Sequence, residues 1–545
     1  MKRALAVVLL LAATLSAQPR LDETIEVSIV NVDVIVTDRS GKRVTGLTVA
    51  DFELREAGKL QPITNFAEYT PPAPGSVSIE STPGTAAPAS VIPPRTPRTV
   101  VIFMEIVRLP PFQAKEMFDA IRELLRKTVA PGDRVAIITW MNGMVVRQPY
   151  TDDRTTLERA LATLEADHVR GPRELAREIR RQQAESDRDA EEVEASSGMP
   201  PVHALDAAKR QLAQIRQKTA ALEALMQSIS GLEGRKIVIM AMRRFGVTAG
   251  VEFFSGVVPL EYQRQLDTSQ IHASLVRSAN AHGITLYPVY APGLRWEPDD
   301  ASTDRQTFTP EDDLERGALQ NNIMLNETTA LSDVAVKTGG LMAWGSANIA
   351  EILPRVAEDL EAYYSLGYRS RGSGKDVTRD IVVKTKNPEY NVRSRRQFVE
   401  KSDQSQMNDR VTANLFDRIG GSSIPVLVTF GQLKSVGRKR WSVPIKVRVP
   451  IAALMTRPEG RVEAGEFSVY VVTGSAVGVT SEVQRRSQPF RIPVADLQKA
   501  KTSHFTYDLT LQVDAAADRI SVGVLDEVSK QFGLNRFMMP ERPAK

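Results

Sequence analysis

The 545-residue chain contains no cysteine, which excludes disulfides, thiolate-ligated zinc, iron–sulfur clusters and cysteine nucleophiles. It also lacks an excess of charge of either sign, because 70 Lys and Arg against 66 Asp and Glu leave a formal net charge of +4. General attraction to nucleic acid is therefore not indicated, and we expect no nucleic-acid partner. The hydrophobic fraction of 42% and the charged fraction of 25% are those of ordinary globular domains.

The chain also lacks a long hydrophobic run, and the apolar run near its N-terminus is short. Residues 1–17 begin with the basic pair Lys2 and Arg3, continue with an apolar run over 4–15 and end at a small residue, Ala17. The run is shorter than the roughly 20 residues that a membrane-spanning helix needs, and the order of features is that of a secretory signal peptide. We expect cleavage near Ala17, no membrane span afterwards, and an extracytoplasmic protein, either periplasmic or secreted.

The rest of the chain divides by composition and periodicity. Residues 24–70 hold four short β-type runs separated by turn signals, which predict a small β domain. Residues 71–97 are rich in proline, with Gly, Ser, Thr and Ala between, and predict a linker. Residues 98–400 predict an α/β domain. Residues 425–537 change to a period of two, which predicts half-buried antiparallel strands and a C-terminal β-sandwich.

Within 98–400, nearly continuous apolar runs alternate with amphipathic helical patterns. We expect buried strands at 99–107, 134–140, 236–242, 284–290 and 341–344. Such alternation predicts a doubly wound, mostly parallel sheet with helices on both faces. Segments between 364 and 396 are interpreted as a strand and a hairpin that close this domain. The insertion at 171–201 is dense in charge and is interpreted as solvated rather than as a partner-binding arm.

Several motifs in this order resemble a von Willebrand factor A (VWFA) domain, and more narrowly the VWFA-related proteins that bacteria secrete. The matching pieces are VDVIVTDRSGKRVTGLTVADFELREAGKLQPITNF before the linker, GRKIVIMAM at the fourth strand and YYSLGYR near Tyr364. The resemblance covers about residues 25–398. It implies a vWA/Rossmann-like fold and ligand binding through a metal ion held at the carboxyl edge of the sheet.

That metal site is degenerate here. The family motif has Asp-x-Ser-x-Ser after the first strand, a Thr in a later loop and an Asp after the fourth strand, and these are oxygen ligands that suit Mg²⁺. In this sequence Glu105 keeps a carboxylate, but Val107 and Leu109 stand at the serine positions. The threonine and aspartate positions fall near Val202 and Met242. We therefore expect no metal ion and no cofactor.

Basic residues accompany the lost ligands. Arg108, Arg243 and Arg244 follow two of the predicted strands, where open α/β sheets bind ligands. Their guanidinium groups would repel a divalent cation and could neutralise Glu105. One interpretation is a ligand-binding surface formed by Glu105 and these three arginines. The interpretation that we favour is an internal ion pair that fills the former metal site.

No catalytic set is readable in the sequence. The five histidines lack zinc-type spacing, and neither a Gly-x-Ser-x-Gly elbow nor a phosphate-binding glycine loop occurs. We predict that the chain is not an enzyme. It is expected to be a binding or scaffold protein whose partners are proteins in the cell envelope or outside the cell. A metal-dependent adhesion module with a rearranged site and an uncharacterised hydrolase remain alternatives.

Overall fold

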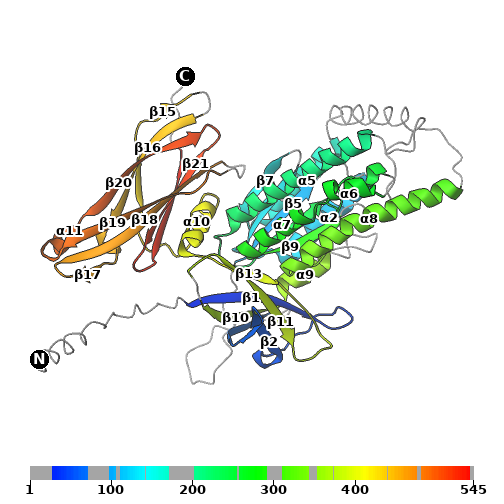
Figure 1. Ribbon diagram of the computed structural model, residues 1–545, viewed down its shortest axis with the longest axis horizontal. Helices are drawn as coiled ribbons and strands as arrows, with labels where there is room; N and C mark the ends of the chain where they lie inside the picture. The colour runs from blue at the N-terminus through cyan, green and yellow to red at the C-terminus, as the bar shows by residue number, and fades with distance from the viewer. Residues whose placement is uncertain are drawn as a thin grey trace, which may run out of the picture.

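The computed structural model describes residues 27–70, 97–105, 111–140, 143–170, 202–242, 244–254, 257–290, 310–342, 353–371, 374–437, 440–475 and 480–539. The expected signal peptide, charged insertion and proline-rich linker lie outside these residues, except for Pro97 at the end of the linker. The described residues form a small β unit, an α/β unit and a C-terminal β-sandwich (Figure 1).

The α/β unit is built on a five-stranded sheet with the strand order β7-β6-β5-β8-β9. Its strands are β5 (Thr99–Glu105), β6 (Arg134–Trp140), β7 (Met144–Thr151), β8 (Lys236–Met242) and β9 (Ile284–Tyr290). β5, β6, β8 and β9 run parallel, whereas β7 pairs antiparallel with β6 at one edge. The mixed, mainly parallel sheet agrees with the α/β class that the alternating pattern predicts.

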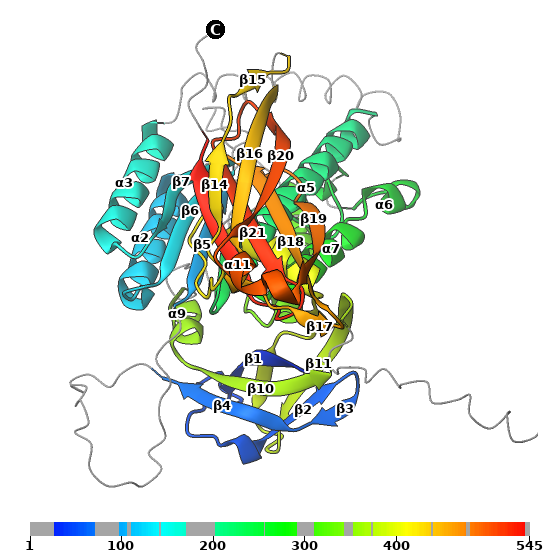
Figure 2. The same cartoon turned by 90° about the vertical axis from the view of Figure 1, so that its left-hand side faces the viewer.

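Helices cover both faces of this sheet (Figure 2). Successive residues of β5 point to opposite sides, so Val101 and Phe103 join one hydrophobic core while Val100 and Ile102 join the other. The first core is completed by α5 (Val202–Ile229), α7 (Ser269–His282) and α8 (Pro310–Thr338). The second is completed by α2 (Pro111–Thr128), α3 (Arg154–Arg170) and α9 (Leu353–Glu361). Burial on both faces explains why these strands are apolar almost throughout.

The expected strand at 341–344 is not present at Leu341 and Met342, and the two following residues are not described. Instead, the C-terminal end of α8 and the residues that follow it lie beside β9. The backbone N–H of Leu286 donates to the Thr338 hydroxyl at 3.2 Å. Gly340 runs so close that a Cβ there would lie 2.0 Å from the Leu286 carbonyl oxygen.

The small β unit consists of two facing sheets made from two separate stretches of chain. β1 (Val27–Thr37), β2 (Phe52–Glu56), β3 (Lys59–Gln61) and β4 (Ile63–Tyr69) precede the α/β unit. β10 (Tyr363–Arg371), β11 (Val377–Thr385), β12 (Asn391–Ser394) and β13 (Gln397–Glu400) follow it. The strand orders are β12-β1-β10-β4 and β13-β11-β2-β3, so the α/β unit is inserted between β4 and β10.

This pairing corrects the expectation that residues 364–396 close the α/β domain. The physical reason is the apolar face of the first four strands, which they cannot bury among themselves. Val32 and Leu54 are covered by Tyr364, Leu366 and Ile381 from the later stretch. The small β domain therefore includes residues on both sides of the α/β unit.

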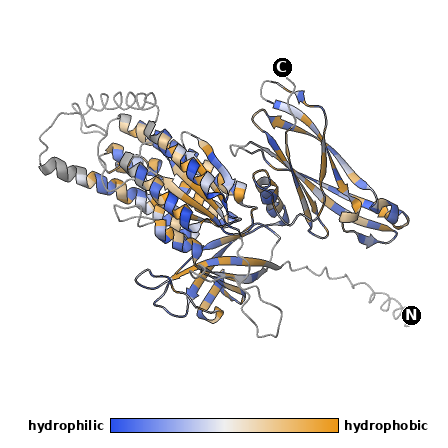
Figure 3. Ribbon diagram, turned by 180° about the vertical axis from the view of Figure 1, so that it is seen from behind, coloured by the Kyte–Doolittle hydropathy of each residue, from blue (hydrophilic) through white to orange (hydrophobic). Residues whose placement is uncertain are grey.

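The C-terminal unit begins with α10 (Asp403–Ala413) and continues as a two-sheet sandwich. One sheet contains β14 (Leu427–Phe430), β15 (Lys434–Ser435), β16 (Arg440–Pro450) and β20 (His504–Asp514). The other contains β17 (Arg457–Glu459), β18 (Val462–Gly474), β19 (Gln484–Pro493), β21 (Arg519–Asp526) and β22 (Phe532–Met538). Apolar and polar residues alternate along these strands (Figure 3), and the inward-facing ones share one core.

In the described part of the chain, none of the helices combines the length and the apolar character that a membrane crossing requires.

Candidate functional site

The candidate site lies where the central strands of the α/β sheet end. Glu105 is the last residue of β5 and is paired with Trp140 of β6, which is buried. On the other side, the register that pairs Met104 with Ala241 brings the end of β8 beside Glu105. That end is Met242, which is fully buried. The carboxylate is thus flanked by an indole and a thioether, neither of which is an oxygen ligand.

A lysine from α5 neutralises this carboxylate. Lys218 Nζ lies 2.8 Å from Glu105 Oε2, and the two side chains are 3% and 17% exposed. Ile215 and Leu222 lie three residues before and four residues after Lys218, on the same helix face, and both pack into the core beneath the sheet. The apolar face that fixes α5 against the sheet therefore also directs the ammonium group to the strand end.

The arginines expected here are placed differently or not described. Arg108 and Arg243 lie outside the described residues. Arg244 has a left-handed backbone with φ of 51°, and its N–H donates to Glu327 Oε1 at 2.9 Å. Its guanidinium Nε lies 3.5 Å from Glu252 Oε1. The structure thus brings Arg244 to two other carboxylates, and the surface of Glu105 with three arginines stays a prediction.

Sequence reasoning missed Lys218, although a signal was available. α5 places apolar residues at Ile215, Leu222 and Leu225, and Lys218 interrupts that stripe at the same helical spacing. A charged residue on the buried face of a helix needs a partner, because an unpaired buried charge is costly. The sequence does not reveal which carboxylate supplies it, because Glu105 is distant along the chain.

The side chains that the structure describes at the strand ends do not form a donor set that suits a divalent cation. An ion bound to Glu105 would have to compete with the Lys218 ammonium at 2.8 Å and would face Trp140 and Met242 where oxygen ligands are needed. Elsewhere in the described part of the chain, no cluster of three or more His, Asp or Glu side chains is placed to hold a metal ion.

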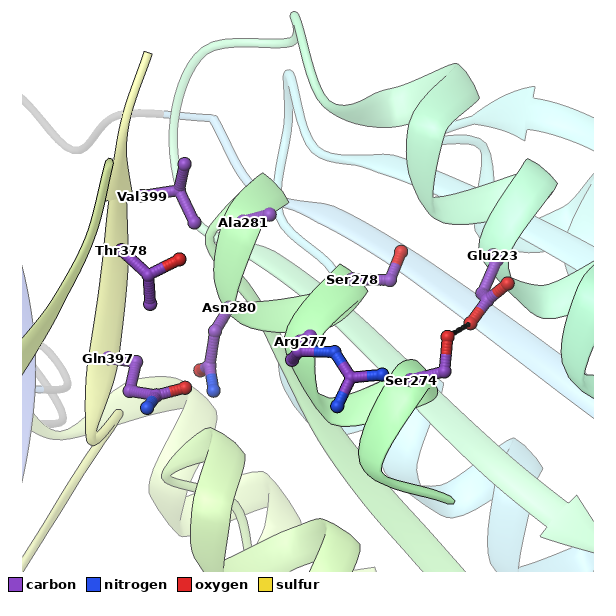
Figure 4. A pocket seen from close by; sticks show the side chains of 9 residues that line it. All are labelled: Glu223, Ser274, Arg277, Ser278, Asn280, Ala281, Thr378, Gln397 and Val399. Carbon is purple, nitrogen blue, oxygen red and sulfur yellow. Dashed lines mark hydrogen bonds between the residues drawn. The ribbon is translucent and has the colours of Figure 1, made fainter. Parts of the chain in front are cut away.

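A separate pocket of about 340 Å³ lies between α5, α7 and the strands β11 and β13 (Figure 4). Its lining is mainly polar and consists of Glu223, Ser274, Arg277, Ser278, Asn280, Ala281, Thr378, Gln397 and Val399. The Ser274 hydroxyl donates to Glu223 Oε1 at 2.7 Å, so this serine is engaged by a carboxylate. The pocket could admit a small polar molecule.

One serine of this pocket lies beside a histidine, but the pair is not built for nucleophilic attack. Ser278 Oγ lies 3.4 Å from His282 Nδ1, and the same nitrogen lies 2.8 Å from the Ser278 carbonyl oxygen. A carbonyl oxygen only accepts, so Nδ1 carries the proton and cannot take one from the hydroxyl. Burial, helped by the nearby Lys401, lowers the pKa of His282 to about 4. His282 is a neutral, structurally bonded side chain in this arrangement.

No known protein family matches the sequence, and no curated protein matches it. The chain has weak similarity to solved structures. An aerotolerance-related membrane protein from Bacteroides fragilis is 13% identical, with 48% of this chain and 97% of that chain covered and a TM-score of 0.24. BatB from Bacteroides thetaiotaomicron is 8% identical, with 48% and 96% covered and a TM-score of 0.21. The pilus adhesin SpaC from Lactobacillus rhamnosus GG is 8% identical, with 90% and 60% covered and a TM-score of 0.23.

Proposed function

We propose that this chain is a non-catalytic binding or scaffold protein that works outside the cytoplasm. Its α/β unit is a doubly wound, vWA-like domain whose metal-ion-dependent adhesion site has been replaced by an internal ion pair. The two β units act as spacers or further contact surfaces, and the ligands are proteins of the cell envelope or the exterior.

The observation that carries this proposal is the contact between Lys218 Nζ and Glu105 Oε2 at 2.8 Å. In a metal-dependent site, the carboxylate at this strand end would be free to coordinate the cation. Here a buried ammonium group of the chain itself supplies that charge. The position corresponding to the fourth-strand aspartate is Met242, which is fully buried.

A metal titration tests the proposal. Millimolar Mg²⁺, Mn²⁺ and Ca²⁺ should leave the thermal unfolding midpoint of the wild-type protein unchanged, because a ligand raises stability only by binding the folded state. If the wild-type protein binds Mg²⁺ or Mn²⁺ with an affinity that Glu105→Ala abolishes, the ion pair is displaceable. The metal-dependent adhesion module is then the better description.

A rebuilt motif provides the positive control. Its five changes are Glu105→Asp, Val107→Ser, Leu109→Ser, Val202→Thr and Met242→Asp, combined with neutral residues at Arg243 and Arg244. With Lys218 retained, this variant should still fail to respond to Mg²⁺, because the ammonium group competes for the carboxylate. Addition of Lys218→Gln should restore a rise in the unfolding midpoint with Mg²⁺. A response that does not depend on Lys218 would contradict its assigned role.

The location outside the cytoplasm is supported by the pattern of residues 1–17. Fractionation of the producing cells followed by N-terminal sequencing tests it. We expect a mature chain that begins close to residue 18 in the periplasm or the medium. A cytoplasmic protein that begins at Met1 would contradict this part of the proposal.

A further inference from the structure

The edge strands of the C-terminal sandwich are not equally protected against pairing with another strand. β19 ends one sheet and carries Arg485, Arg486 and Arg491 together with Pro489, which are residues that discourage pairing with another strand. β22 ends the same sheet on the other side and is covered by residues 422–426. There the N–H of Ser423 donates to the Phe532 carbonyl at 2.9 Å.

The other sheet is protected at only one end. β14 and β15 occupy that end, and they are short strands of four and two residues. β20 occupies the opposite end with 11 residues, HFTYDLTLQVD, and contains no Pro, Lys or Arg. It pairs with β16 along its whole length without a register shift. Among the described residues, β20 is the one long sandwich edge that carries neither a proline nor a lysine or arginine, although it has two aspartates.

The pairing of β20 with β16 shows which backbone N–H and C=O groups of β20 point away from the sheet. The Pro444 carbonyl accepts from the N–H of Gly431, so residue 444 of β16 points toward β14. Thr510 pairs with Pro444, and its own N–H and carbonyl therefore point away from β16. By alternation Thr506, Asp508 and Gln512 do the same. No described residue bonds to the outward backbone groups of these four residues, and all four side chains are exposed.

The inward-facing side chains next to this edge are incompletely covered. Leu511 and Val513 are buried, whereas Phe505, Tyr507 and Leu509 are half-buried. The Phe505 ring lies 4.5 Å from that of Phe490 on the facing edge strand β19. β20 belongs to the sheet of the sandwich that lies farther from the α/β unit, because α10 packs against β18 and β21 of the other sheet (Figure 1). A further strand beside β20 could therefore pair without meeting that unit and would cover apolar surface.

The sequence of β20 is complementary to itself. In an antiparallel pair of two copies centred on Leu509, Asp508 faces Thr510 of the second copy, Thr506 faces Gln512, and His504 faces Asp514. No like charges lie opposite each other, and residues whose backbone groups point outward face one another, as hydrogen-bonded pairs require. A register centred on Asp508 would instead place two carboxylates opposite each other. The Leu509 register is also the one that overlaps the whole strand.

We propose that this protein forms a symmetric dimer through β20, in which the sheets of two sandwiches join across a two-fold axis at Leu509. The interface is isologous, because the same strand is used by both copies. It is independent of the proposed binding function, since β20 is remote from the strand ends of the α/β sheet (Figure 1). Such an interface gives the molecule two outward-facing α/β units.

Paired substitutions at Thr510 test both the dimer and its register. Thr510→Asp places a carboxylate opposite Asp508 of the second copy at two symmetric positions, and Thr510→Lys places an ammonium group there. We expect the dissociation constant to rise about twofold to thirtyfold with Asp and to fall by a similar factor with Lys. Ser435→Asp on β15 adds the same charge at the opposite edge of the same sheet, outside the row that contains Asp508, and it should change nothing.

The measurement is sedimentation velocity over a range of concentrations, with the chain lacking residues 1–17. Thr510 is exposed, so both variants should fold, and equal unfolding midpoints verify this. A wild-type chain that stays monomeric at all concentrations overturns the proposal. So does a dimer that neither variant affects, or one that both variants shift in the same direction, because only the Leu509 register predicts opposite signs.

Discussion

Arg393 binds the carboxylate of Asp359 with two parallel hydrogen bonds, Nη1 to Oδ2 and Nη2 to Oδ1, each 2.8 Å long. Arg393 lies on β12 of the small β unit and Asp359 on α9 of the α/β unit, so the pair joins the two. Arg43 also bonds to this carboxylate, and Arg235 Nη1 donates to the Asp359 carbonyl oxygen at 2.7 Å. One buried aspartate therefore gathers three arginines at the junction where the α/β unit is inserted.

Asp359→Asn should strongly lower the unfolding midpoint. The substitution removes the charge that compensates Arg43 and Arg393, and loss of one partner from a buried ion pair costs roughly 3–5 kcal/mol. Asp333→Asn is the matched control, because Asp333 pairs with Lys337 on the exposed side of α8. That change should cost less than about 1 kcal/mol. Thermal unfolding monitored by circular dichroism would show the difference, and equal midpoints for the two variants would contradict the assigned role of Asp359.

The ion pair at the strand ends should behave as a coupled unit. Lys218→Met should destabilise the protein by about 3–5 kcal/mol, because it removes the ammonium group 2.8 Å from the part-buried Glu105 carboxylate. Lys209→Met on the exposed side of the same helix should have little effect. The double variant Glu105→Leu with Lys218→Met should recover much of the loss, since it leaves neither charge behind. Additive losses, measured by urea unfolding, would show that the two residues are not coupled.

The local pattern predicted the buried strands well. The ranges 134–140, 236–242 and 284–290 match β6, β8 and β9, because these apolar runs are bordered by charged residues and turn signals. The pattern did not predict which segments that are distant in the sequence pair with each other. Tyr364 and Val34 pair across the whole inserted α/β unit, and strand periodicity carries no information about which distant strand will be the neighbour. The link between Lys218 and Glu105 was missed for the same reason.

The stability of the α/β unit should fall on acidification because of His272. This residue is 4% exposed, and its ring lies 4.4 Å from that of Phe245. Burial lowers the pKa of His272 from 6.5 to about 4, although Asp333 and Asp267 partly oppose the shift. Between these two values the unfolded chain binds more protons than the folded one, so stability is fully present above pH 6.5 and is lost as the pH falls toward 4.

The variant His272→Gln isolates this contribution. The wild-type loss between pH 7 and pH 4 should include about 3 kcal/mol from this histidine, at roughly 1.4 kcal/mol per pKa unit. The variant starts from a lower stability at pH 7 and should show a correspondingly shallower dependence. Urea unfolding at several pH values gives both curves. Parallel curves for the two proteins would mean that His272 does not titrate on unfolding.

Gly231 allows the C-terminal unit to pack against the α/β unit. It lies in the turn between α5 and β8, and a Cβ at this position would lie 2.6 Å from the Asp409 carbonyl oxygen and 2.7 Å from the Arg410 Cα. Both neighbours are backbone atoms of α10, so they cannot rotate away as a side chain could. α10 in turn packs against the sandwich through Met407 and Val411. The backbone contact at Gly231 therefore sets how closely this helix approaches the α/β unit.

Gly231→Ala should displace α10 and destabilise the protein by roughly 1–3 kcal/mol, the usual range for overpacking. Gly317→Ala is the control, because no atom lies within 4 Å of a Cβ there and Gly317 is an exposed residue of α8. That change should be neutral or stabilising by up to about 1 kcal/mol, as alanine favours a helix over glycine. Hydrogen exchange of the α10 amides should accelerate in Gly231→Ala and stay unchanged in Gly317→Ala. Unaltered exchange and unfolding in Gly231→Ala would mean that the turn moves away from α10 at little cost.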